Sequence, residues 1–150
     1  AEEFGATIEA YTYPDEFMEC DGSAQVVAGV NIGQQARKSF GISYRTRVGN
    51  DVAGDNLGYK IHVIYNCQAA PSGKTYSTVN ESPEAITFSW ELSTTPVPVE
   101  GYRPTATVVI DSTKVSADAL EEVEAALYGT EDQEAQLPSI ENLLAMLSAE

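Results

Sequence analysis

The chain has 150 residues, of which 43% are hydrophobic, and carries a formal net charge of -15 from 8 Lys and Arg against 23 Asp and Glu. This length and apolar content allow one hydrophobic core, so we expect a single domain over residues 1–150. The charge excludes binding to nucleic acid through neutralised phosphates, because an acidic surface repels them. No segment approaches the roughly 18 apolar residues of a membrane span, so no membrane partner is expected.

Alternating patterns in the first half of the chain predict β-strands. Residues 5–13 place small and apolar side chains on one side and polar ones, including Glu9, on the other. Residues 37–48 and 59–67 form two further strands, and residues 49–58, rich in Gly and Asn, connect them as a hairpin. We therefore expect an antiparallel pair in this part of the chain.

The segments between these strands carry turn signals. Pro14 ends the first strand and starts one short helical turn. The stretch that follows, as far as Gly33, is expected to be a loop with one short strand. Residues 70–83 form a long polar loop, and the prolines of residues 96–104 predict a bend that cannot sustain a ladder.

Residues 85–94 have the most regular alternation of apolar and polar residues in the chain, which predicts a strand with one buried and one solvent-exposed face. The inward set consists of Ile86, Phe88, Trp90 and Leu92, and the outward set of Thr87, Ser89, Glu91 and Ser93.

A β-branched strand at residues 105–110 leads into an amphipathic helix over about 116–128. Ser116 is the expected N-cap, Val115 can pack on Leu120 as a hydrophobic staple, and Gly129 ends the helix. Its apolar stripe is Ala119, Leu120, Val123, Ala126 and Leu127, and its solvated acids are Glu121, Glu122 and Glu124.

Leu137-Pro138 opens a short C-terminal helix over about 138–147. The expected fold is therefore mainly β: two packed antiparallel sheets, as a sandwich or partial barrel, flanked by one main helix and this short one. The apolar face of the short helix consists of Ile140, Leu143, Leu144 and Leu147.

The charges are unevenly distributed along the chain. Residues 111–150 hold ten acids and one base, whereas residues 31–60 hold five bases and two acids. Acidic helices and a basic hairpin can pair between neighbouring subunits, and a simply solvated acidic surface is the alternative. Two cysteines are too few for a disulfide framework, and Cys67 continues an alternating series that predicts a small buried side chain.

No catalytic or metal-binding signature is present, so we expect no enzyme, no cofactor and no metal. His62, the single histidine, has no nucleophile tied to it by a recognisable motif. The Gly-Lys-Thr at residues 73–75 lacks the earlier glycine of a phosphate loop, and no acidic pattern supports calcium. Four tyrosines can line a sugar-binding surface or fill cores and contacts: Tyr59, Tyr65, Tyr76 and Tyr102.

Several whole segments, covering nearly the full chain, carry a family resemblance through their combination and order. They are YTYPDEFMECDG, GVNIGQQARKSFGISYRTRVGND, GYKIHVIYNCQAAPS, YSTVNESPEAITFSWELSTTPV, ATVVIDSTKV and LYGTEDQEAQLPSIENL. In these segments the sequence resembles the tail tube (major tail) proteins of long-tailed bacteriophages and related prophages of Gram-positive bacteria.

The resemblance implies a structural virion protein, made in the bacterial host cytoplasm, whose six-subunit rings stack into a tube through which DNA leaves the capsid. It also implies contacts with the tape measure, terminator and distal tail proteins. Relatives carry a further N-terminal segment, so we expect this chain to be a fragment or a processed product. The alternative function is a non-catalytic β-sandwich module that binds carbohydrate or a surface.

A conduit for DNA is expected to have a lumen of hydroxyls and carboxylates, which leave no cationic trap for phosphates. The candidate lining residues are Glu9, Thr87, Ser89, Glu91 and Ser93. The candidate assembly contacts are Ile140, Leu143, Leu144 and Leu147.

Overall fold

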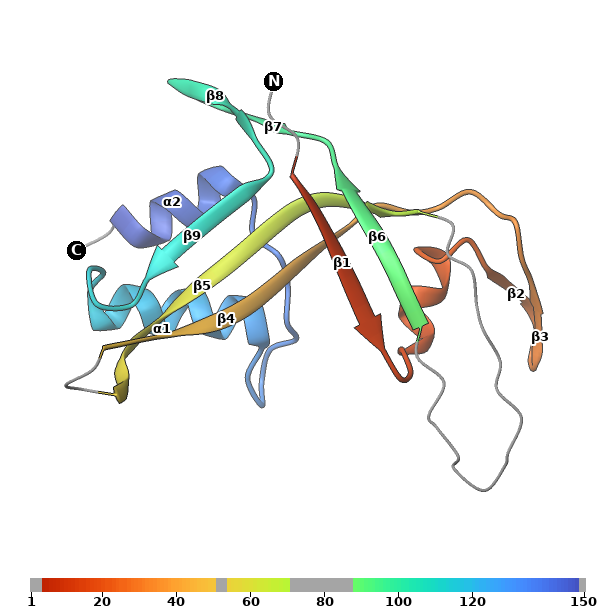
Figure 1. Cartoon of the computed structure of the whole chain (residues 1–150), viewed down its shortest axis with the longest axis horizontal. Coiled ribbons are helices and arrows are strands. Elements are labelled where there is room, and N and C mark those ends of the chain that lie inside the picture. The colour runs from red at the N-terminus through yellow and green to blue at the C-terminus, as the bar shows by residue number, and fades with distance from the viewer. Residues whose placement is uncertain (1–3, 51–53, 71–87, 149–150) are drawn as a thin grey trace. The chain divides into compact units, whose positions relative to one another are not determined.

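The computed structural model describes residues 4–50, 54–70 and 88–148 (Figure 1). The chain is mainly β, with curled antiparallel sheets and two α-helices, which confirms the expected fold class. It divides into two compact units. The first unit consists of Ala1–Phe40 and Asn66–Thr95, and the second of Gly41–Tyr65 and Pro96–Glu150.

The first unit is built on a ladder between β1 (Gly5–Ala10) and β6 (Phe88–Thr94), which lie antiparallel and side by side in Figure 1. The end of β5 (Gly54–Ala69) pairs with the other side of β6 through Cys67 to Ala69. A 3-10 helix at Asp15–Glu19 follows β1, which confirms the helical turn expected after Pro14.

The core of the first unit is aromatic and contains a buried charge. Trp90 is 1% exposed, and neighbouring ring centroids in the cluster lie between 5.1 and 6.0 Å apart. Buried Asp21 accepts a hydrogen bond from Trp90 Nε1 at 2.6 Å, and the guanidinium of Arg37 lies 3.8 Å from the same carboxylate oxygen. The other rings of the cluster belong to Tyr13, Phe17, Phe40 and Phe88.

The second unit is a sheet packed against both α-helices. β5 lies between β4 (Phe40–Asn50) and β9 (Thr107–Asp111), and its pairing with β9 is antiparallel. α1 (Ala117–Tyr128) and α2 (Ile140–Ser148) supply the apolar surface opposite these strands. The buried cluster between them consists of Ile61, Val63, Tyr65, Ile110, Val123, Leu127, Ile140 and Leu143.

α1 begins as its sequence predicts, whereas α2 begins at Ile140, two residues after the expected start at Pro138. The Ser116 hydroxyl accepts a hydrogen bond from the Ala119 amide at 3.2 Å, and Ser139 caps α2 in the same way through the amide of Asn142. Gly129 ends α1 with a φ of 78°, a backbone conformation that other residues rarely adopt. The predicted stripe of α1 faces the core, with Leu120 only partly buried.

The structure corrects the extent of two expected connections. Residues 49–58 are not all connection, because β4 continues to Asn50 and β5 starts at Gly54. The stretch before Gly33, expected to be a loop with one short strand, holds two paired strands, β2 (Ala24–Val27) and β3 (Val30–Ile32). The Gly, Asn and Gln residues of both stretches occur in strands as well as in turns, so composition alone did not locate the ends of the strands.

The bend expected over residues 96–104 is also wrong. β7 (Val97–Val99) and β8 (Tyr102–Thr105) form an antiparallel hairpin, with an irregular register between Val97 and Val99. Proline lacks an amide hydrogen, but every strand of a two-stranded ladder is an edge strand, where proline is tolerated. The polar loop expected at residues 70–83, with its Gly-Lys-Thr, lies outside the described residues from position 71 onward.

Candidate lining face and association surfaces

The structure brings four of the five candidate lining residues onto one face of the β1 and β6 ladder. Glu9 lies opposite Ser89 in the register, and Gly5 lies opposite Ser93. Glu91 pairs with Thr7, which places its carboxylate diagonally across from that of Glu9. Thr87, the fifth candidate, lies outside the described residues.

This lining face is polar and acidic. Glu9, Glu91 and Ser93 are exposed, whereas the alternate residues Trp90 and Leu92 are buried beneath them. The third strand of the face contributes the exposed side chain of Gln68, which is paired with Ser93. Residues 5–10, 67–69 and 88–94 contain no Lys or Arg, so these paired stretches offer phosphates no cationic partner.

β1 lies at an edge of its sheet. It pairs with β6 on one side, and none of the described strands pairs with its other side. The amides and carbonyls along this side can therefore accept a further strand.

The four apolar candidates of α2 have different environments. Ile140 and Leu143 are 5% and 0% exposed and pack into the core of the second unit. Leu147 is partly buried against that core, while Leu144 is 43% exposed. Packing inside the chain therefore accounts for Ile140 and Leu143, while Leu144 and the partly buried Leu147 stay predicted assembly contacts.

The β2 and β3 hairpin exposes apolar side chains that the sequence analysis missed. The exposed fractions are 60% for Val26, 59% for Val27, 50% for Val30 and 43% for Ile32. A signal was available, because residues 22–36 contain no charged side chain. Exposed apolar residues gathered on one short hairpin are typical of a surface that is covered by a partner.

A second missed cluster joins the basic hairpin to the acidic helix within the chain. Arg45 lies 3.2 Å from the Glu124 carboxylate and 4.9 Å from the ring centroids of both Tyr59 and Tyr128. The Tyr59 hydroxyl donates to Glu124 at 2.5 Å, and this hydrogen bond raises the pKa of Tyr59. The expectation that Glu124 faces water is therefore wrong, because the helix turns it toward the sheet.

His62 is held by two neighbours on the strands. Its Nε2 lies 2.8 Å from the Thr46 hydroxyl, and its ring stacks on Tyr44 with centroids 4.7 Å apart. Within the described residues no three His, Cys, Asp or Glu side chains form a group that could hold a metal ion. None of the helices in this part of the chain has the length and apolar character to cross a membrane.

The tyrosines considered for sugar binding do not form one surface in the described structure. Tyr65 is buried, and burial raises its pKa to about 12, while its hydroxyl donates to the Pro138 carbonyl at 2.8 Å. Tyr59 is engaged by Glu124, and Tyr102 is 80% exposed at the start of β8. Tyr76 lies outside the described residues.

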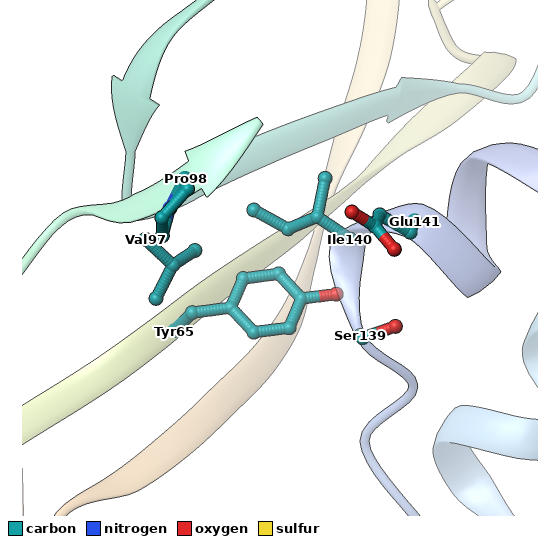
Figure 2. Close-up of a pocket in the computed structure, with 6 residues that line it drawn as sticks. All are labelled: Tyr65, Val97, Pro98, Ser139, Ile140 and Glu141. Carbon is teal, nitrogen blue, oxygen red and sulfur yellow. The ribbon is translucent and has the colours of Figure 1, made fainter. Parts of the chain in front are cut away.

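A pocket of about 250 Å³ opens beside the start of α2 in the second unit. Figure 2 shows the side chains of Val97 and Ile140 on either side of it, with the Tyr65 ring as its floor. The Glu141 carboxylate lies beside Ile140 at the rim. The sequence analysis did not predict this pocket, because its wall depends on the unexpected strand β7.

Comparisons of the chain with models of protein families, with characterised proteins and with solved structures found no match.

Proposed function

We propose that this protein is a non-enzymatic structural subunit of a bacteriophage tail tube, which assembles into stacked hexameric rings and conducts DNA. The observation that carries the proposal is the acidic lining face on β1 and β6. Two strands about 80 residues apart in the sequence contribute carboxylates and hydroxyls to it, without a cation in the paired stretches. The resemblance of the sequence to tail tube proteins supports the same function.

The lining face suits a DNA conduit because of its charge and its position at a sheet edge. A strand added to the free side of β1 would continue the sheet into the next subunit, as in a barrel whose strands join edge to edge. Repeated around a ring, the face would present Glu9 and Glu91 to the channel. Carboxylates repel DNA phosphates over a screening distance of roughly 10 Å at 0.1 M salt, so DNA can pass without being bound.

The exposed apolar side chains of the β2 and β3 hairpin support association with further copies. In the proposed assembly the partners are other copies of the chain and, by resemblance, the tape measure, terminator and distal tail proteins. The proposed location is the tail of the virion.

Bulky thiol labelling can test the lining assignment in assembled tubes. Cys20 and Cys67 are both buried, so an introduced cysteine is the reactive thiol among the described residues. We expect Glu91→Cys to react with a polymer-linked maleimide in the free subunit and to be protected in tubes. The matched variant Glu121→Cys, on the exposed face of α1, should react in both states.

Two outcomes would contradict the proposal in different ways. If Glu91→Cys reacts in tubes as fast as Glu121→Cys, tubes form but the lining face is wrongly assigned. If the purified protein stays monomeric at every concentration examined by light scattering and electron microscopy, the assembly itself is contradicted.

A further inference from the structure

The tip of the β7 and β8 hairpin carries an exposed aromatic side chain next to an exposed cation. Tyr102 has the highest exposed fraction, 80%, of the large hydrophobic side chains in the described residues. Arg103 follows it and has no ion-pair partner among those residues. Tyr and Arg are, with Trp, the residue types enriched among the side chains that dominate protein interfaces.

The pocket beside α2 has complementary features. Its wall is apolar, through Val97, Pro98, Ile140 and the ring of Tyr65, and its volume of about 250 Å³ is below the roughly 300–1,000 Å³ of small-molecule sites. A cavity of this size suits one large side chain. The Tyr65 hydroxyl is already bonded to Pro138, so the floor of the pocket presents mainly the ring.

The rim of the pocket carries a negative charge, Glu141, that can pair with the positive charge of Arg103. Glu141 is exposed in the first turn of α2, where the helix dipole favours a carboxylate, and no described cation pairs with it. Cations are scarce in this region, since Lys114 is the one base between residues 111 and 150. The exposed Glu141 carboxylate is therefore free to pair with a cation of another molecule.

The hairpin cannot fill the pocket of its own chain in this structure. Val97 and Pro98 belong to β7, and the ladder pairs Val99 with Tyr102, so the strand that lines the pocket also carries the tip. The exposure of Tyr102 shows that its ring is outside the pocket. An occupant with this chemistry is, however, present on every other copy.

We propose that Tyr102 of one copy inserts into the pocket of a second copy and that Arg103 then pairs with Glu141 at the rim. This inference rests on the proposed function, because it supplies a contact between subunits of the tube. The contact joins two different surfaces, so each bound copy keeps one free tip and one free pocket. Such head-to-tail contacts continue until a ring closes or a filament grows.

Charge reversal tests the contact within the full chain. Arg103→Glu places two carboxylates together at each contact, and Glu141→Arg places two guanidiniums together. We expect each single variant to weaken self-association by about tenfold or more, as measured by sedimentation velocity over a concentration series. The double variant restores opposite charges and should recover association to within about threefold of the natural chain.

Matched controls separate the contact from net charge. Lys114→Glu and Glu131→Arg make the same charge changes at other exposed positions and should leave association within about threefold. Tyr102→Phe keeps the ring and should associate normally, whereas Tyr102→Ala should weaken association as strongly as the charge reversals. Near-ultraviolet circular dichroism checks that each variant is folded.

The outcomes distinguish this inference from the proposed function. If the single reversals match their controls, or the double variant does not recover, the contact is wrong even where tubes still form. If the reversals behave as expected but the product is a small ring or dimer that never becomes a tube, the contact stands and the tube function fails. A natural chain that stays monomeric at every concentration overturns both.

Discussion

The two units stabilise their cores in different ways. The first unit buries a charge, since Asp21 lies beside Trp90 and Arg37 within an aromatic cluster. The second unit has an apolar core between sheet and helices, and its ion pair between Arg45 and Glu124 is partly exposed. A buried charge is costly unless every partner is in place, so the first core depends on hydrogen-bond geometry and the second on filled volume.

The largest effect is expected from Leu143→Ala in the second unit. Leu143 is fully buried, so its truncation leaves a cavity and should lower the free energy of unfolding by about 2–5 kcal/mol. Urea denaturation measures the change. Leu144→Ala, one position further on and 43% exposed, is the matched control and should cost less than about 0.5 kcal/mol. Equal costs would contradict the assignment of α2 to the core.

In the first unit, Trp90→Phe should be the next most destabilising change. It keeps an aromatic ring in the cluster but removes the N–H that donates to Asp21 at 2.6 Å. A hydrogen bond to a charged group contributes about 1.5–3 kcal/mol, so a loss of that size is expected in urea denaturation. Phe88→Leu, a change to a partly buried ring of the same cluster, tests whether ring packing alone gives the loss. If Trp90→Phe lowers the free energy of unfolding by less than Phe88→Leu does, the hydrogen bond to the buried Asp21 does not stabilise the core beyond ring packing.

Alkaline pH should distinguish the units through their buried acids. Burial raises the pKa of Cys67 in the first unit from 9.0 to about 11, and that of Tyr65 in the second from 10.0 to about 12. Each unfolded group loses its proton before the folded one does, so the stabilisation is complete below the unfolded pKa and falls as pH rises. The Cys67 contribution declines between about pH 9 and 11, and the Tyr65 contribution between about 10 and 12.

Cys67→Ala isolates the first of these windows. It should reduce the fall in the urea midpoint between pH 9 and 10, where the raised pKa of Cys67 contributes more than that of Tyr65. Tyr65→Phe is the matched variant, because it should change the fall below pH 10 less than Cys67→Ala does. The same slope in Cys67→Ala and the natural chain would contradict the role given to the thiol.

The sequence predicted those features that depend on local periodicity. Alternation identified the buried Trp90 and the exposed Glu91, and the Ser116 cap and apolar stripe located α1. It also placed the candidate lining residues on two strands, although their pairing across the ladder emerged only from the structure. Hydrophobic periodicity and helix capping depend on residues close together in the sequence, so they can be recognised without knowledge of the fold.

The missed features depend on contacts between distant segments. Asp21 follows a short helical turn like any solvated acid, and its buried position depends on partners distant in the sequence, among them Trp90, 69 residues later. Glu124 lies on the acidic side of α1, yet Arg45 and Tyr59 engage it from the sheet. The pocket required β7, which proline content argued against. Such partners are set by the tertiary fold, which overrides local preference.

The smallest predicted effect concerns the ion pair of the second unit. Arg45 and Glu124 have side chains that are 48% and 26% exposed, so water and salt screen their attraction. Glu124→Gln keeps the shape of the side chain and should lower the free energy of unfolding by no more than about 1 kcal/mol. The natural chain should lose that advantage when salt is raised from about 0.05 to 0.5 M, whereas the variant should not.

Asp21→Asn is the matched comparison for the response of Glu124→Gln to salt. It makes the same chemical change at a carboxylate that is only 7% exposed, where salt has little access. We expect a larger destabilisation than for Glu124→Gln, with little dependence on salt, because the partly buried Arg37 would lose the carboxylate beside it. If the stability of both variants responds to salt alike, the two carboxylates have equivalent environments. The proposed contrast between a buried charge in the first unit and a screened ion pair in the second is then wrong.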